Sequence, residues 1–164
     1  MALRCIADHA PLTHEAITNG LRAVSLPGRF QRVPDARGFE WVFDVAHNPA
    51  AAATLAANLR ALPVAGRTIA VCGMLGDKDV PGVVSEVRSA CDVWLAATSE
   101  GPRAIDAAEL QRRAAGAGVT MEAAGTIDAA LRRAGALARP GDRVVVFGSF
   151  HTVGPALAGV GVHL

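Results

Sequence analysis

The chain has few aromatic residues, a single lysine and only three cysteines. Its 164 residues contain no tyrosine and 4% aromatic residues, so a stacking surface for single-stranded nucleic acid is not expected. The formal net charge of +1 provides no field that would attract nucleic acid or an anionic membrane. Cys5, Cys72 and Cys91 are too few and too widely spaced for a disulfide framework or a zinc site. Their pattern indicates a reducing, cytoplasmic location.

Long apolar runs are also missing. Charged residues, glycines or prolines interrupt every candidate for a transmembrane helix, and the N-terminus lacks the pattern of a signal peptide. His9, His14 and His163 have no partners at the spacing of metal ligands, so no metal site is expected. The remaining composition, 51% hydrophobic and 19% charged residues, is typical of one domain with a real core.

Short β-branched runs alternate with alanine- and leucine-rich stretches along the chain. This alternation predicts an α/β fold: a Rossmann-like, mostly parallel sheet of about six strands with one antiparallel edge strand and helices on both faces. The first two strands are antiparallel because their link is too short for a crossover. Strands are expected at 29–33, 39–45, 67–72, 92–97, 119–122 and 143–147, and helices at 13–24, 49–62, 80–90, 106–115, 127–137 and after Pro155.

Four loops follow the predicted strands, and in such sheets ligands bind beyond the carboxyl ends of the strands. The loops span 44–49, 73–79, 98–103 and 148–154. The polar residues of unusual type fall in these loops, which makes them the candidate site.

The first candidate segment is Asp44-Val-Ala-His47-Asn48-Pro49. Asp44 could accept two hydroxyl hydrogen bonds from a ribose. The alternative is that Asn48 caps a helix while Asp44 accepts hydrogen bonds from loop amides. The nearby Arg29 is either a surface residue or a guanidinium directed at a phosphate or carboxylate.

The other loops each allow a functional and a structural interpretation. The segment from Gly73 to Asp79 could cradle an anion, but it matches neither dinucleotide- nor P-loop patterns. Alternatively, Asp79 caps a helix and Lys78 lies in water.

Ser149, His151 and Thr152 could together bind a carboxylate or phosphate, or form a hydroxyl-capped loop, and no nucleophile elbow is present. Glu100 and Arg103 are expected to form a turn with an ion pair.

Taken in order, five motifs carry a resemblance. They are Leu26-Pro-Gly-Arg-Phe30, Asp44-Val-Ala-His-Asn-Pro49, Gly73-Met-Leu-Gly-Asp-Lys-Asp79, Glu100-Gly-Pro-Arg103 and Gly148-Ser-Phe-His-Thr-Val153. The series resembles the C-terminal part of the bacterial dihydrofolate synthase/folylpolyglutamate synthase family, within the Mur ligase superfamily. The resemblance covers residues 12–158.

This resemblance implies an ATP-dependent ligase that joins L-glutamate to dihydropteroate or a reduced folate through an acyl phosphate. By resemblance, Arg29 contacts an ATP phosphate, and Asp44 holds the ribose close to the reaction centre. Asp44 and His47 are the candidate catalytic residues. His47 and Ser149 are also candidates for the glutamate side of the site. Lys78 is a weaker candidate there.

The resemblance also predicts the domain organisation. Residues 1–26 correspond to the last helices of a preceding ATPase domain and a linker, and 27–164 to the Mur ligase C-terminal domain. The family's P-loop and its Mg²⁺ ligands belong to the larger domain, so ATP and Mg²⁺ would be used only with that partner, and this chain alone would be inactive. Apolar residues such as Ile17 and Leu21 would favour association through 12–24.

Two alternatives stay open at this stage. The chain could be a stand-alone binding module that keeps the fold without the reaction. A peptidoglycan Mur ligase domain is disfavoured because the Asp-Val-Ala-His-Asn-Pro and Gly-Ser-Phe-His-Thr-Val segments are the folate-type versions. The choice between dihydrofolate synthesis and polyglutamate extension depends on loops of the larger domain.

Overall fold

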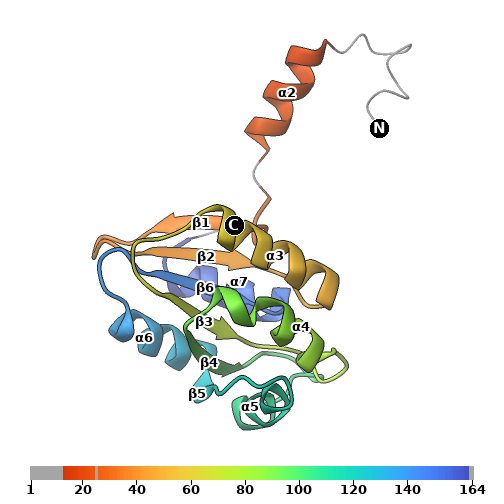
Figure 1. Ribbon diagram of the computed structural model, residues 1–164, viewed down its shortest axis with the longest axis vertical. Coiled ribbons are helices and arrows are strands. Elements are labelled where there is room, and N and C mark those ends of the chain that lie inside the picture. The colour runs from red at the N-terminus through yellow and green to blue at the C-terminus, as the bar shows by residue number, and fades with distance from the viewer. Residues whose placement is uncertain (1–12, 25, 163–164) are drawn as a thin grey trace.

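The computed structural model describes residues 13–24 and 26–162, which form a six-stranded sheet flanked by helices (Figure 1). Residues 1–12, part of the segment 1–26 that the resemblance ascribes to a preceding domain and linker, lie outside the described residues. The strands are β1 (Gln31–Pro34), β2 (Glu40–Asp44), β3 (Thr68–Cys72), β4 (Val93–Thr98), β5 (Glu122–Thr126) and β6 (Arg143–Phe147). The helices are α2 (His14–Ala23), α3 (Pro49–Ala61), α4 (Val80–Val87), the 3₁₀ helix η1 (Arg88–Ala90), α5 (Ala107–Ala115), α6 (Ile127–Leu137) and α7 (Phe150–Gly159).

The strand order is β1-β2-β6-β3-β4-β5. Only β1 and β2 pair antiparallel, and the other neighbours are parallel. The predicted sheet, with its antiparallel edge strand, is therefore confirmed. The last strand in sequence, β6, lies between β2 and β3, so the centre of the sheet is completed by the end of the chain.

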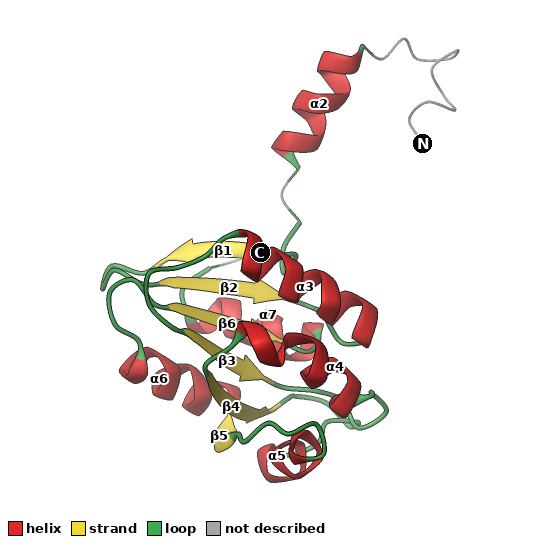
Figure 2. Cartoon of the chain, viewed as in Figure 1, coloured by secondary structure: helices red, strands yellow, loops and turns green. Residues whose placement is uncertain are grey.

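Helices cover both faces of the sheet, as predicted (Figure 2). One core contains the apolar sides of α3, α4 and α5, and the other contains those of α6 and α7. All five residues of β6 are buried, which explains its continuous run of valines: neither side of this strand meets water.

Short polar side chains fix where four of the helices begin. In each case a side-chain oxygen of the residue before the helix accepts a hydrogen bond from an amide of the first turn, and for Asn48 and Asp79 this is the capping role that the sequence offered. The pairs are Asn48 with Ala51 (2.9 Å), Asp79 with Gly82 (3.0 Å), Asp106 with Glu109 (2.7 Å) and Thr126 with Ala129 (3.2 Å).

Two predicted strand boundaries are wrong. The strand expected at 29–33 begins only at Gln31, because Gly28 (φ +67°) and Phe30 (φ +47°) turn the chain just before it. The strand expected at 119–122 is β5, which starts pairing at Glu122. Val119 and Met121 are buried in the core and lead the chain from α5 to the sheet.

The last helix also differs from the prediction. It starts at Phe150, five residues before Pro155, so the predicted 148–154 loop ends at Ser149. Pro155 lacks an amide hydrogen and so removes one helical hydrogen bond. Burial of Val153, Ala156 and Leu157 against the sheet compensates for that loss.

A buried arginine holds the other end of the sheet, where β6 begins. Arg143 is 2% exposed. Its Nε donates to Glu40 Oε1 at 2.8 Å, and its other nitrogens donate to the carbonyl oxygens of Leu59 and Leu62. Burial would raise the pKa of Glu40, but hydrogen bonds from Arg143 and Arg32 hold it below its usual value. One side chain thus joins β6, β2 and the end of α3.

Arg143→Met should lower the free energy of unfolding by about 2–4 kcal/mol, because two carbonyl oxygens and Oε1 of the half-buried Glu40 lose their donor, while Oε2 keeps Arg32. Urea unfolding measures this. Arg132→Met is the matched control, because its partner Asp128 is exposed and such pairs contribute about 0–1 kcal/mol. Equal losses in the two variants would contradict the assignment.

The same pair predicts a pH dependence. The pKa of Glu40 is lowered in the folded chain, so its stabilisation is present above the unfolded value of about 4.3 and is lost as the pH falls through the folded value. The difference in unfolding free energy between wild type and Arg143→Met should therefore shrink from pH 7 to pH 3.

Two glycines allow the loops after β6 and β3 to touch. Gly148 has φ +126°, and a Cβ there would lie 2.0 Å from the carbonyl oxygen of Gly73. The amide of Gly73 donates to the carbonyl of Phe147 at 3.1 Å. A side chain at position 148 would therefore force the two loops apart.

Gly148→Ala should lower the unfolding free energy by about 2–5 kcal/mol, from left-handed backbone strain and overlap with Gly73. Gly20→Ala is the control, because no atom lies within 4 Å of the added carbon. Urea unfolding followed by near-ultraviolet circular dichroism distinguishes the two. Normal stability of Gly148→Ala would show that the loops do not cross this closely.

Candidate functional site

The predicted site residues gather at one edge of the sheet, where β2, β6, β3 and β4 end; we call this the carboxyl edge. Asp44 pairs in register with Phe147, and Phe147 with Cys72. The loops after these three strands therefore start level with one another. His47, Ser149 and Lys78 come from these loops.

Asp44 is half-buried at the end of β2. Its two carboxylate oxygens accept hydrogen bonds from the amides of Phe30 (2.9 Å) and Ala46 (2.8 Å). Burial raises the pKa of Asp44, although these amides and the nearby Arg29 guanidinium oppose the rise. The structural interpretation, in which Asp44 accepts loop amides, is therefore what the structure shows. Each oxygen keeps a further lone pair that a hydroxyl group could reach.

The turn before β1 brings Arg29 to Asp44. The amide of Val45 donates to the carbonyl of Gly28 at 2.8 Å. Gly28 has φ +67°, and a Cβ there would lie 3.0 Å from Val45 and 3.1 Å from Val153. This close approach favours glycine at position 28. Arg29 is exposed, and none of the ion pairs among the described residues involves it.

A hollow of about 310 Å³ opens beside Asp44 and Arg29. Apolar side chains and two neutral polar side chains from α3 complete its wall. The lining residues are Arg29, Phe30, Asp44, Ala51, Thr54, Leu55 and Asn58. Sequence reasoning missed Thr54 and Asn58, which lie one helical turn apart on the side of α3 that faces this hollow.

His47 has one defined hydrogen bond. Its Nδ1 lies 2.8 Å from the carbonyl oxygen of Val45. A carbonyl oxygen can only accept, so this contact assigns the proton to Nδ1 and leaves Nε2 as an acceptor in the neutral ring.

Lys78 shares a carboxylate with a residue from the next loop. Its Nζ and the Arg103 guanidinium each lie 3.2 Å from Asp77 Oδ2. The hydrogen bond from Lys78 is the main reason that the pKa of Asp77 is lowered. The ion pair expected between Glu100 and Arg103 is not formed, because the amide of Gly76 donates to the Arg103 carbonyl at 2.7 Å and brings this loop to Asp77.

Ser149 is 6% exposed and precedes α7. Its hydroxyl lies 3.1 Å from that of Thr152, which in turn contacts Ser99 and the carbonyl of Gly73. The sequence did not point to Ser99, because no local pattern connects it with Thr152, its hydrogen-bond partner 53 residues later. The exposed His151 lies near Gly101.

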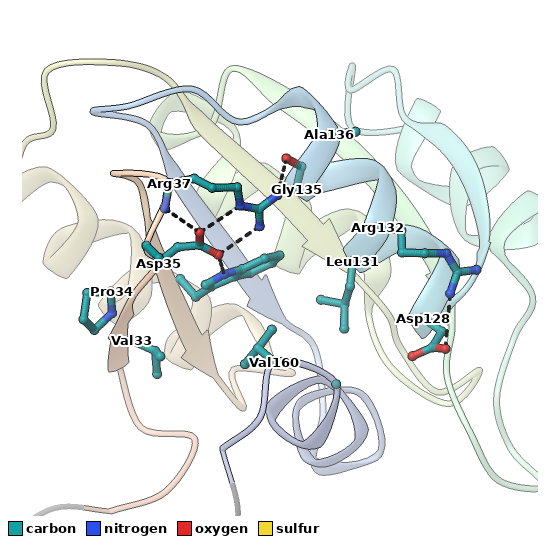
Figure 3. Close-up of a pocket in the computed structure, with 13 residues that line it drawn as sticks. Val33, Pro34, Asp35, Arg37, Asp128, Leu131, Arg132, Gly135, Ala136 and Val160 are labelled. Carbon is teal, nitrogen blue, oxygen red and sulfur yellow. Dashed lines mark hydrogen bonds and ion pairs between the residues drawn. The ribbon is translucent and has the colours of Figure 1, made fainter.

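A larger hollow of about 680 Å³ lies elsewhere, between the β1–β2 turn, α6 and the end of α7 (Figure 3). Its wall contains none of the predicted site residues. Asp35 there accepts hydrogen bonds from Arg37 and from Trp41 Nε1, and Arg37 also donates to the Gly135 carbonyl. The Arg37 hydrogen bond holds the pKa of Asp35 far below its usual value. These polar groups form hydrogen bonds with one another, so we assign them a structural role: they connect the β1–β2 turn to α6.

Two further properties concern the described residues, 13–24 and 26–162. No three histidine, cysteine, aspartate or glutamate side chains among them are grouped so as to hold a metal ion. No helix in this part of the chain is long and apolar enough to cross a membrane.

The chain is similar in sequence to known ligases. The family model of the Mur ligase, glutamate ligase domain, matches residues 28–150. Dihydrofolate synthase/folylpolyglutamate synthase of Escherichia coli (strain K12) is 42% identical over 147 residues, which cover 90% of this chain and 33% of that protein. The UDP-N-acetylmuramoyl-L-alanyl-D-glutamate–2,6-diaminopimelate ligase of Corynebacterium glutamicum is 33% identical and covers 91% of this chain and 31% of that protein.

A solved structure agrees with these relatives. The bifunctional folylpolyglutamate synthase/dihydrofolate synthase with Mn, AMPPNP and L-glutamate bound superposes with a TM-score of 0.81 at 40% identity, over 92% of this chain and 35% of that one. The chain thus spans about one third of the length of the relatives it matches. Its sequence and its sheet together show that it belongs to the Mur ligase family, as the C-terminal, glutamate ligase domain of the dihydrofolate synthase/folylpolyglutamate synthase type.

Proposed function

We propose that this chain is the C-terminal domain of an ATP-dependent ligase that adds L-glutamate to dihydropteroate or a reduced folate. One observation carries the proposal. Asp44 and Arg29 lie together beside a hollow at the carboxyl edge, in a chain that is 40% identical to a ligase with AMPPNP and L-glutamate bound.

The reaction proposed has two steps. The folate carboxylate attacks the γ-phosphorus of ATP, forming an acyl phosphate and releasing ADP. The amine of glutamate then attacks the acyl carbon, the bond to phosphate breaks, and the amine gives up a proton as the amide forms. Both steps need reactants from two domains to meet, so most of the rate advantage comes from positioning.

On the nucleotide side, Asp44 would accept hydrogen bonds from the ribose hydroxyls. Its amide partners fix both oxygens and leave lone pairs open. Arg29 would bind a phosphate, because a guanidinium forms strong charge-assisted bonds with phosphate oxygens and this one is exposed beside Asp44.

On the glutamate side, Lys78 would bind a substrate carboxylate in place of Asp77, its present partner. Arg103 shares that partner and would join the same contact. His47 and Ser149 would lie nearest the amine, since their loops follow the adjacent strands β2 and β6.

Mg²⁺ would come with the nucleotide and be held by the partner domain. Asp44 is the only carboxylate that lines the hollow, and the described residues contain no group of side chains fit to hold a metal ion. They therefore do not fit a metal centre of their own, and we assign no step of this chain to one.

The partner domain would also cover α2. This helix extends away from the sheet (Figure 1) and buries none of its residues, and Leu21 within it and Val24 directly after it are exposed. A ten-residue helix is marginal in water without packing, so α2 needs a partner. We assign residues 1–26 to the preceding ATPase domain and its linker; self-association through 12–24 is the competing assignment, and gel filtration of the chain alone distinguishes them.

The nucleotide assignment is tested in a hybrid ligase, in which this chain replaces the matching third of the Escherichia coli relative. Arg29→Ala and Asp44→Ala should each lower kcat/KM for ATP by more than about tenfold, because each removes a charge-assisted contact of roughly 1.5–3 kcal/mol. Steady-state ADP release measures this.

Arg112→Ala is the matched control, because that arginine is exposed and pairs only within α5. Its kinetics should equal those of the unmodified hybrid. Unchanged kinetics in both Arg29→Ala and Asp44→Ala would contradict the assignment of the nucleotide side.

A further inference from the structure

A buried hydroxyl joins three loops at the carboxyl edge. Thr152 is fully buried. Its Oγ1 lies 2.8 Å from the Gly73 carbonyl oxygen, 2.8 Å from Ser99 Oγ and 3.1 Å from Ser149 Oγ. These partners follow β3, β4 and β6, so one side chain contacts the ends of three neighbouring parallel strands.

The directions of these hydrogen bonds follow from counting protons. A threonine hydroxyl has one proton to donate and two lone pairs that accept. The Gly73 carbonyl can only accept, so the Thr152 proton goes to it. Both lone pairs of Thr152 are then left for Ser99 and Ser149, and each serine must donate its proton to Thr152.

The cluster is closely fitted around this arrangement. A Cβ on Gly73 would lie 2.7 Å from Ser99 Oγ and 2.9 Å from Thr152 Oγ1. A side chain there would displace both hydroxyls. In the described part of the chain, no buried side-chain nitrogen or oxygen lacks a hydrogen-bond partner, and each hydroxyl of the cluster has a partner within it.

Ser149 can therefore not donate to a ligand. Its hydroxyl proton is already donated to Thr152, and only its lone pairs remain to accept a hydrogen bond from a ligand. His47, from the loop after the neighbouring strand β2, donates its Nδ1 proton to the Val45 carbonyl, which leaves Nε2 of the neutral ring as an acceptor. Two acceptors thus stand at this edge, whereas Lys78 and Arg103 are donors.

We propose that Thr152 is a positioning residue that fixes Ser149 as a hydrogen-bond acceptor for the amine of the incoming amino acid. This rests on the proposed function and reverses the expectation that Ser149 and Thr152 bind a carboxylate or phosphate. In this arrangement the Ser149 hydroxyl oxygen accepts a hydrogen bond from an N–H of the amine. The carboxylates of the substrate are left to the cationic side chains of the 73–79 and 99–105 loops.

The test compares L-glutamate with glutarate, which has the same two carboxylates and no amine, in the hybrid ligase. The readouts are the KM for glutamate, the competitive inhibition constant of glutarate and the KM for ATP. Ser149→Ala and Thr152→Val should each raise the KM for glutamate by about tenfold, the size of one strong hydrogen bond. The glutarate constant and the KM for ATP should stay within about twofold.

Two conservative variants serve as controls. Thr152→Ser keeps the hydroxyl and should restore the glutamate KM that Thr152→Val loses. Ser89→Ala removes an exposed hydroxyl of η1 that contacts Arg60, outside the cluster, and should leave all three constants within about twofold. Urea unfolding of the 164-residue chain shows whether each variant folds, and Ser149→Ala tests the polarity of Ser149 even if Thr152→Val does not fold.

The outcomes separate the two proposals. Equal weakening of glutamate and glutarate by Ser149→Ala would show that Ser149 donates to a carboxylate and would overturn this inference. An unchanged glutamate KM in folded Thr152→Val would also overturn it. A hybrid with unmodified residues that releases no ADP in response to glutamate would instead count against the proposed function itself.

Discussion

The structure depends on the parallel pairing of β6 between β2 and β3. This register places Asp44, Phe147 and Cys72 level, so the loops that follow must share the space beyond them. Gly73 and Gly148 make that space sufficient, because neither has a Cβ to hold the loops apart. The strand that completes the centre is the last one in the chain. The carboxyl edge is therefore assembled only when the whole domain has folded.

The two ends of the sheet perform different tasks. At the amino end of β6, the buried Arg143 pairs with the half-buried Glu40, and both groups have their partners inside the domain. At the carboxyl edge, Arg29 is exposed and unpaired among the described residues, and Asp44 keeps open lone pairs although burial raises its pKa. The first arrangement stabilises the fold; the second leaves charge available to a ligand at some cost in stability.

Much of the fold could be predicted from local sequence, because its signals are local. Caps such as Asn48 and Asp79 and the valine run of β6 identified elements and the sheet class. Two features could not be predicted. The boundaries of the elements near Phe30 and Pro155 depend on tertiary contacts that override local preference. Site contacts such as Thr152 with Ser99, or Arg103 with Asp77, join segments that only the folded sheet brings together, and no local pattern announces them.

The central claim is that this chain supplies one half of a composite ligase site. The most direct test measures ADP release with ATP, Mg²⁺, glutamate and dihydropteroate or tetrahydrofolate, using the chain alone and the chain mixed with a separately expressed ATPase domain of the Escherichia coli relative. The account predicts no release by either part alone and glutamate-dependent release by the mixture. Release by the chain alone, or none by the mixture while the intact relative is active, would contradict it.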